Sequence, residues 1–197
     1  MKKLFTLKFL LVALSLCILT ACSDDEKVAT KGQFTLQDEA TKIASGFFVY
    51  DTSPNTDGEE NVYHRNQIIF YGKGLKVLQT GPEPEPVGEG NLLELYINNE
   101  GQTLETGTYT WQAEENEQPF DLWYGLLTLG VNSGDETDYR LQSGEMVVSK
   151  SGSAYKITFT GTAYLEFEGE FKQNAGLPAL TVTATFEGKL KRVGFDF

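Results

Sequence analysis

Apolar and polar residues alternate along most of the chain beyond residue 32, and this two-residue period is typical of β-strands with one face in water. The clearest run is 180–186, where Leu, Val, Ala and Phe alternate with three threonines. The same pattern predicts further strands at 33–37, 42–50, 62–71, 75–79, 91–98, 107–111, 120–131, 143–149, 154–159 and 164–171. We expect Leu190 and Val193 to extend the last strand.

Turn residues separate these runs, and no segment shows the period of an amphipathic helix of useful length. The strongest local signal is a hairpin over 143–159, with Gly152 in its turn. The pattern predicts one all-β domain over 32–197, an antiparallel β-sandwich of about ten strands. A closed, lipocalin-like β-barrel is the alternative that the pattern leaves open. The proline-rich segment 81–86 is expected to be an extended loop that cannot pair as a ladder, because proline lacks a backbone donor.

The first residues differ from this pattern. Lys2, Lys3 and Lys8 form a positive head, and an almost purely apolar run follows at 9–19. As a helix, that run would span roughly 16 Å, whereas a membrane's hydrocarbon core is about 30 Å thick. A positive head, a short apolar run and small residues before a cut are typical of an export signal. We therefore interpret 1–21 as a signal peptide.

The end of this segment, Leu19-Thr20-Ala21-Cys22, resembles the lipobox of bacterial lipoproteins. The resemblance implies cleavage between Ala21 and Cys22, and a diacylglyceryl group on the Cys22 thiol. Residues 22–31 would then form a flexible, lipid-anchored tether. The acidic run at 23–26 is similar to the surface-export signal of Bacteroidetes-type outer-membrane lipoproteins. It implies an outer-membrane, lipid-anchored location, facing the cell exterior.

Composition removes several classes of function. Without 1–21, the chain has 13 Lys and Arg (16 less 3) against 28 Asp and Glu, a formal charge of −15. Such a chain repels nucleic-acid phosphates and anionic headgroups, so we expect no nucleic-acid partner and membrane contact through the lipid anchor only. Because Cys17 leaves with the signal and Cys22 is lipidated, no cysteine pair remains for a disulfide.

Catalytic and metal chemistry find no support in the sequence. The single histidine, His64, has no partner motif and is interpreted as a surface or rim residue. Residues 53–64 resemble a calcium loop only faintly, because a serine begins that segment and His64 stands where a bidentate glutamate is needed. Glu94, Glu166 and Glu168 are interpreted as wet-face strand residues. We expect no enzyme activity, no catalytic or metal-binding residues and no cofactor.

Four aromatic residues are the remaining candidates for a site. Tyr96, Trp111, Trp123 and Tyr124 could stack against a sugar ring or fill a partner's pocket. The competing interpretation is that they fill the interior of the domain, which applies most strongly to Trp111 and Trp123. The pattern does not decide between the two.

The whole domain also resembles a recurrent type of small Bacteroidetes lipoprotein. The resemblance is carried by 88–96, 107–110, 143–152 and 185–190, which are strand and turn segments. The resemblance implies a cellular location and a fold, but no activity. From the anchor, the lack of catalytic motifs and the four aromatic candidates, we expect a non-catalytic binding module for a glycan or a protein. A structural accessory subunit of a surface assembly and a calycin-like carrier of a small apolar ligand remain alternatives.

Overall fold

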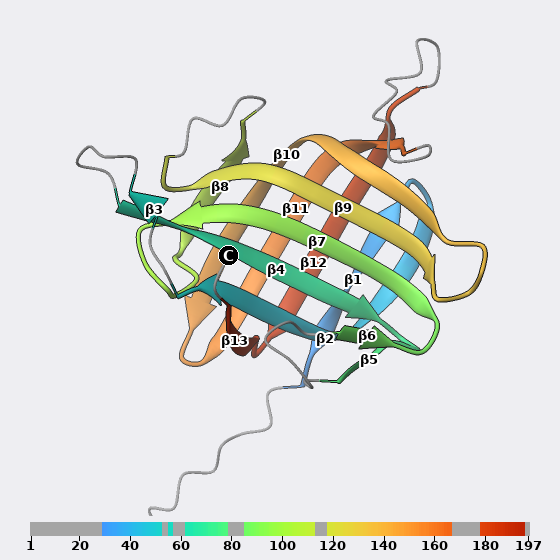
Figure 1. The fold of residues 1–197 in the computed structure, drawn as a ribbon, viewed down its shortest axis with the longest axis horizontal. Coiled ribbons are helices and arrows are strands. Elements are labelled where there is room, and N and C mark those ends of the chain that lie inside the picture. The colour runs from blue at the N-terminus through green and yellow to red at the C-terminus, as the bar shows by residue number, and fades with distance from the viewer. Residues whose placement is uncertain are drawn as a thin grey trace, which may run out of the picture.

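The computed structural model describes residues 29–52, 55–56, 62–78, 85–112, 118–166 and 178–195. All regular structure in these ranges is β-strand (Figure 1). The strands are β1 (Lys31–Leu36), β2 (Glu39–Asp51), β3 (Asn55–Thr56), β4 (Val62–Gly72), β5 (Lys76–Leu78), β6 (Glu85–Val87), β7 (Gly90–Asn99), β8 (Gly107–Trp111), β9 (Asp121–Val131), β10 (Thr137–Ser151), β11 (Ala154–Leu165), β12 (Leu180–Gly188) and β13 (Lys191–Phe195). No helix in the described ranges combines the length and hydropathy that a transmembrane span requires.

The strands close into a barrel. β1, β2, β4, β7, β9, β10, β11 and β12 pair in that order, each antiparallel to the next, and β12 pairs again with β1. β8 enters the wall as a ninth strand between β9 and β10. The all-β expectation is therefore confirmed, and the barrel alternative fits the structure better than the sandwich.

Long strands that change partner explain the closure. β10 pairs with β9 through Thr137 to Arg140 and with β8 through Glu145 to Val148. A register irregularity between Leu141 and Ser143 lies where the partner changes. Bulges of this kind bend a strand and increase its twist, which lets a sheet curl onto itself. The alternation in sequence is the same for a sandwich and a barrel, so it could not separate them.

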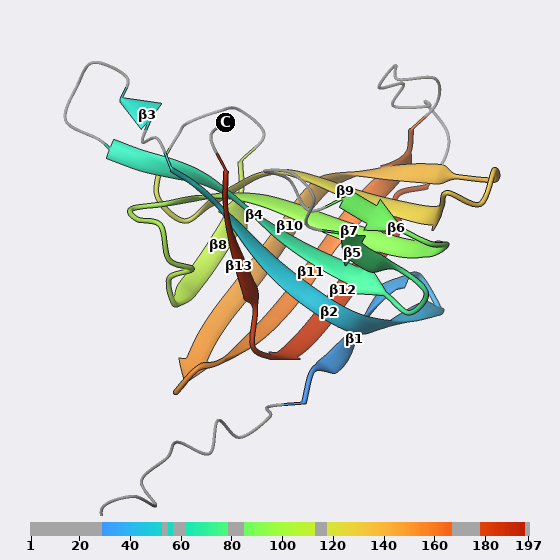
Figure 2. The ribbon, with the colours of Figure 1, turned by 60° about the horizontal axis from the view of Figure 1, so that its bottom comes forward.

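Two strands fill the gaps where neighbours diverge. β8 runs parallel to β9, and β13 runs parallel to β2 with Val193 opposite Val49 (Figure 2). The expectation that Leu190 and Val193 extend the last long strand is therefore wrong. β12 ends at Gly188, the chain turns, and Val193 belongs to a separate strand on β2. In the sequence, neither Gly188 nor the charged pair Lys191-Arg192 indicated that the chain leaves β12 and pairs with β2.

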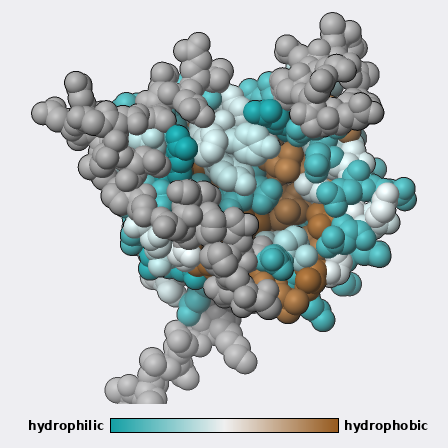
Figure 3. Space-filling model, in the orientation of Figure 1, coloured by the Kyte–Doolittle hydropathy of each residue, from teal (hydrophilic) through white to brown (hydrophobic). Residues whose placement is uncertain are grey.

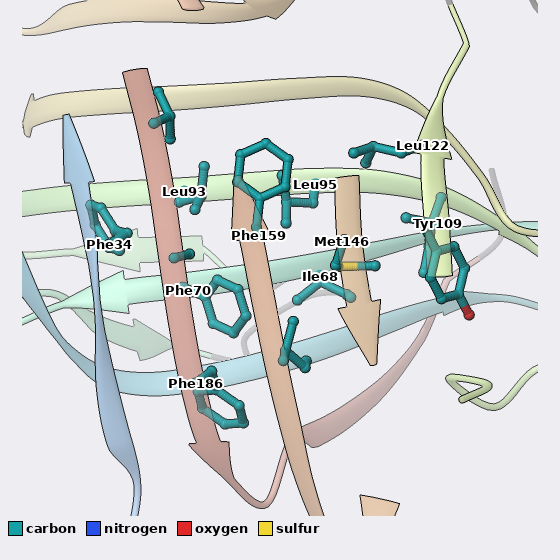
Figure 4. Close-up of a cluster of buried hydrophobic side chains, with 14 of the residues drawn as sticks. Phe34, Ile68, Phe70, Leu93, Leu95, Tyr109, Leu122, Met146, Phe159 and Phe186 are labelled. Atoms are coloured by element: carbon teal, nitrogen blue, oxygen red, sulfur yellow. The ribbon is translucent and has the colours of Figure 1, made fainter. Parts of the chain in front are cut away.

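The barrel interior is filled by side chains. Aromatic rings from opposite walls meet there, and Phe70 and Phe186 lie 5.1 Å apart between ring centroids. Figure 4 shows these rings among aliphatic side chains from both walls. The interior side chains that are at most 1% exposed are Phe34, Phe48, Ile68, Phe70, Leu93, Leu95, Ile97, Tyr109, Leu122, Leu127, Leu141, Met146, Ile157, Phe159, Val182 and Phe186. The interior is thus a packed core.

A second apolar cluster lies outside the barrel wall. Phe47 of β2 packs edge-on against Tyr71 of β4, with ring centroids 5.4 Å apart. Leu75, Val77 and Val193 belong to the same cluster, so the β5–β6 hairpin and β13 cover this face. Strand β4 is therefore apolar on both faces. Pairing of Val77 with Pro86 corrects the expectation that the whole segment 81–86 stays unpaired. Proline is tolerated in this short two-stranded ribbon, which has free edges.

The other expected strands have clear outcomes. The hairpin over 143–159 is confirmed, with Ser151 opposite Ala154 at its turn. The expected strand at 164–171 is not separate at its start, because Tyr164 and Leu165 end β11. Residues 167–171 of that expectation lie outside the described residues, as does Glu168.

Candidate functional site

A bulge in β9 places two consecutive aromatic side chains on the outer face of the barrel. Ile97 of β7 pairs with Leu122, whereas the preceding Tyr96 pairs with Tyr124, so Trp123 is an extra residue. Leu122 is fully buried in the interior, and both Trp123 and Tyr124 are half-buried. An extra residue breaks the strict in–out alternation of a strand and re-aims its side chains.

The bulge gathers three of the four predicted aromatic residues. Tyr96 meets the rings of Trp123 and Tyr124 edge-on, with centroid distances of 5.4 and 5.1 Å. The Trp123 and Tyr124 centroids lie 6.2 Å apart. We call Tyr96, Trp123 and Tyr124 the aromatic face. Tyr96 packs edge-on against both other rings, and this contact restricts the orientation of all three.

Two arginines from the neighbouring strands lie over these rings. The guanidinium carbon of Arg65 on β4 is 5.6 Å from the Trp123 ring centroid. That of Arg140 on β10 is 5.0 Å from the Tyr124 centroid. Both distances are in the range of cation–π attraction. The aromatic face therefore carries a donor-rich group on each side.

Carboxylates and amides complete the surroundings of the aromatic face. Gln67 donates from Nε2 to Glu94 Oε1 at 2.8 Å, and Thr128 Oγ1 donates to Asp138 Oδ1 at 2.6 Å. Burial raises the pKa of the Tyr124 hydroxyl, and the charge of Glu166 raises it further, while Arg140 opposes them. Glu166 is held here because its backbone N–H donates to Asp138 O at 2.8 Å.

Strands β7 and β9, which carry the aromatic face, and β4, which carries Arg65, are in front in Figure 1. Figure 3 shows pale and brown surface near the centre of this side, among hydrophilic atoms. Trp111 does not join it. That side chain packs against the edge of the interior core, as one of the two interpretations expected. Ala21 and Cys22 lie outside the described residues.

His64 is buried, so its interpretation as a surface residue is wrong, whereas its place opposite the last residue of β7 fits the rim of the barrel. It is 9% exposed and its Nδ1 has no hydrogen-bond partner. The side chain belongs to the end of the barrel that the loop between β7 and β8 closes. There Tyr109 donates from its hydroxyl to Asn99 Oδ1 at 2.6 Å, and Asn66 Nδ2 donates to Gly101 O at 3.4 Å. The sequence around His64 does not indicate that the loop between β7 and β8 closes over this end of the barrel.

In the described part of the chain, no three His, Cys, Asp or Glu side chains lie close enough together to hold a metal ion. Most of the faint calcium-loop resemblance at 53–64 falls outside the described residues.

Comparisons of the chain with protein-family models, with curated proteins and with solved structures gave no match. Sequence reasoning found the three rings of the aromatic face but missed Arg65, Gln67 and Arg140. The adjacent Trp123-Tyr124 pair was the one available signal of the bulge, since a strand with one wet face does not place two consecutive large rings inside. Nothing in the sequence placed Arg65, Gln67 and Arg140 beside these rings, because the pairing of their strands is decided by how the barrel closes.

Proposed function

We propose that this protein is a lipid-anchored cell-surface binding module, held by Cys22 in the outer membrane, that binds a glycan or a protein through its aromatic face without catalysing a reaction. The observation that carries the proposal is the bulge at Trp123. It turns two large rings outward beside a third, and edge-on contacts with that third ring restrict their orientation. Half-buried aromatic residues at a surface are the residue types that dominate binding energies.

A carrier of a small apolar ligand has less support, although the barrel itself suits one. Fully buried rings such as Phe70 and Phe159 fill the interior, so a ligand would have to displace them. A hollow of about 190 Å³ lies beside β1, β11 and β12, with Lys31, Lys156 and Glu187 in its lining. Its volume is below the roughly 300 Å³ at which ligand pockets begin, so it is small for a carrier's binding site.

An accessory subunit that adds strands to a partner also has less support. That function predicts a long unprotected sheet edge, and the described edges of the main sheet are β3, with 2 residues, and β13, with 5 residues. Among the described residues, the two exposed large apolar side chains are Leu78 on β5 and Val147 on β10. They do not form one patch.

Binding through the aromatic face is tested with the full chain in detergent, applied to a glycan array and to pull-downs from cells. The Trp123→Ala/Tyr124→Ala double variant should weaken any specific binding at least about 30-fold, which corresponds to about 2 kcal/mol. Thr158→Ala/Thr160→Ala, which changes two exposed side chains of β11, is the matched control and should bind normally. Equal binding by both double variants would place the ligand elsewhere and contradict the proposal.

The anchor is tested separately. Metabolic labelling with palmitate should mark the wild-type chain in the envelope fraction, and Cys22→Ser should remove the label and release the chain from that fraction. One acyl chain gives only marginal membrane binding, whereas two or more give stable anchoring. A Cys22→Ser chain that keeps the label and stays in the envelope would show that the anchor is not at this thiol.

A further inference from the structure

Exposed lysines gather at the end of the barrel where β1 begins. Lys31 is the first residue of β1, and Lys156 is the third residue of β11. Both lie opposite Glu187 of β12, one on each side of it. The hollow of about 190 Å³ beside these strands is lined by both lysines and by Glu187, together with Thr158 and Thr185. Two positive charges therefore flank one negative charge around this hollow.

Two more exposed lysines lie at the same end. Lys150 is the last but one residue of β10, just before the turn into β11, and Lys191 is the first residue of β13. The ammonium nitrogen of Lys150 is 4.8 Å from the Tyr155 ring centroid, and that of Lys191 is 5.1 Å from the Phe47 centroid. Figures 1 and 2 both show the β10–β11 turn and the starts of β13 and β1 at the lower end of the molecule. We call Lys31, Lys150, Lys156 and Lys191 the lysine end.

Acidic side chains mark the other ends of the same strands. Asp38 and Glu39 lie at the turn that follows β1, and Asp135 and Glu136 lie at the turn that precedes β10. All four are exposed. The formal charge of −12 on the whole chain is therefore spread unevenly over the described residues.

The loop between β7 and β8 also reaches the end of the barrel where the lysines lie. It brings Glu100 and Glu105 there, and Arg192 of β13 donates from its guanidinium to Gln102 O of the same loop at 2.9 Å. Lys189, between β12 and β13, adds a further positive charge. Together with Glu187, the two loop acids make three negative charges against the lysine end, Lys189 and Arg192. The excess of charge at this end is positive.

The proposed anchor keeps this end close to a membrane. Lys31 follows Cys22 by nine residues, and a chain spans at most about 3.5 Å per residue, so Lys31 lies within roughly 30 Å of the lipidated thiol. That limit holds whatever path the intervening residues take. The end of the barrel that the anchor holds near the membrane is therefore the lysine end.

Net charge alone predicts membrane contact through the lipid anchor only, because an acidic chain is repelled by anionic headgroups. That argument applies to a chain at a distance. Once the anchor holds the domain at the surface, charges further away than the Debye length, about 8 Å at physiological salt, are largely screened. The nearest side chains then decide the interaction, and a lysine close to an anionic surface strengthens binding about fivefold.

We infer that the lysine end docks on the phosphate headgroups of the membrane in which Cys22 is anchored, and that the β1–β2 turn then points away from that membrane. Phosphate oxygens are strong acceptors for the three N–H donors of each ammonium group. This inference rests on the proposed lipid anchor and adds to it a second contact, which sets the orientation of the domain.

The test uses the full chain, purified with its lipid and anchored in vesicles of phosphatidylcholine or of phosphatidylcholine mixed with phosphatidylglycerol. In the proposed mature chain the Cys22 thiol is acylated, so an introduced cysteine can carry a fluorescent label. Ser153→Cys, in the turn between β10 and β11, reports on the lysine end, and Glu39→Cys, after β1, is the control position. A quencher on the lipid headgroups measures how close each label lies to the membrane.

The label at residue 153 should be quenched at least about twofold more strongly on the anionic vesicles than on the neutral ones. High salt should remove this increase, because it screens the attraction. The label at residue 39 should be quenched equally on both kinds of vesicle.

Two triple variants separate local charge from net charge, because each removes three exposed lysines. The variant of the lysine end is Lys31→Gln/Lys150→Gln/Lys156→Gln, and the matched control at the other end of the barrel is Lys42→Gln/Lys73→Gln/Lys76→Gln. The first should lose most of the increase in quenching, and the second should keep it. Equal losses in both would show that net charge alone acts, and would overturn the inference.

Flotation with the neutral vesicles checks the anchor separately. A chain that floats with them but is quenched equally at residue 153 on both kinds of vesicle would overturn the docking and sustain the anchor. A chain that does not float with neutral vesicles would contradict the anchor at Cys22, and the docking with it.

Discussion

Gly144 and Gly161 face each other across β10 and β11, at a point where no larger residue fits. A Cβ atom at Gly161 would collide with the backbone carbonyl oxygen of Ser143, and one at Gly144 would collide with the Phe159 ring. Paired glycines covered by an aromatic ring let a barrel wall bend sharply while keeping its core dry. These two residues thus set the curvature of the wall where β10 and β11 pair.

Gly161→Ala should therefore lower the free energy of unfolding by about 2–3 kcal/mol, because the clash is with backbone and cannot be relieved by a side-chain rotation. Gly101→Ala is the control, since the nearest atom to its added Cβ is Glu105 Oε1 at 3.8 Å. Urea denaturation of both variants measures the difference. A Gly161→Ala midpoint equal to that of Gly101→Ala would show that the wall does not depend on this close approach.

The element that closes one end of the barrel is the loop between β7 and β8. Leu104 of this loop is 3% exposed and belongs to the interior core. The hydroxyl of Tyr109, in the middle of β8, lies 2.6 Å from Asn99 Oδ1 and 3.1 Å from Glu105 O, and its single proton is shared between these two acceptors. Burial raises the pKa of the Tyr109 hydroxyl well above its usual value of about 10, and the charge of Glu105 raises it further. The loop is therefore tied down by a phenol that must stay protonated.

This pKa shift predicts alkaline instability. The folded chain holds the Tyr109 proton more tightly than the unfolded chain, so the stabilisation is complete below about pH 10 and falls as the pH rises further. Tyr71, whose pKa burial also raises, contributes in the same direction. Tyr109→Phe should cost about 1–2 kcal/mol at neutral pH, because Asn99 Oδ1 loses its donor, and should flatten the decline above pH 10. Thermal melts from pH 7 to 11 measure both effects, and parallel declines for the two chains would contradict this account.

The positions of the strands could be predicted from sequence because alternation is local. The period at 180–186 matches β12, Leu180–Gly188, and the expected strand at 107–111 matches β8 in full. The closure could not be predicted, because it depends on which strand β10 pairs with on each side of Leu141. The aromatic face was predictable as a set of residue types. Its exclusion of Trp111 and its inclusion of Arg65 follow from register, which the sequence does not display.

At the scale of the whole molecule, β13 holds the second apolar cluster in place. Val193 packs in that cluster, and Leu190 reaches the interior core. A chain that ends at Lys189 should lose about 3–5 kcal/mol of stability, from the burial of these two side chains. A chain that ends at Phe195 keeps every described strand and is the control. Limited proteolysis and thermal melts compare the two, and equal resistance would show that β13 is dispensable.

The pairing of β1 with β12 joins Lys31 to Glu187 across almost the whole length of the chain. A polypeptide is made from its amino end, so β1 has no partner on that side until β12, Leu180–Gly188, has emerged. Contacts so distant in sequence are slow to form, and a partly emerged chain leaves strand edges unpaired. The barrel therefore cannot close before β12 has been made. Until then, the outer edge of β1 is open to any other strand that can pair with it.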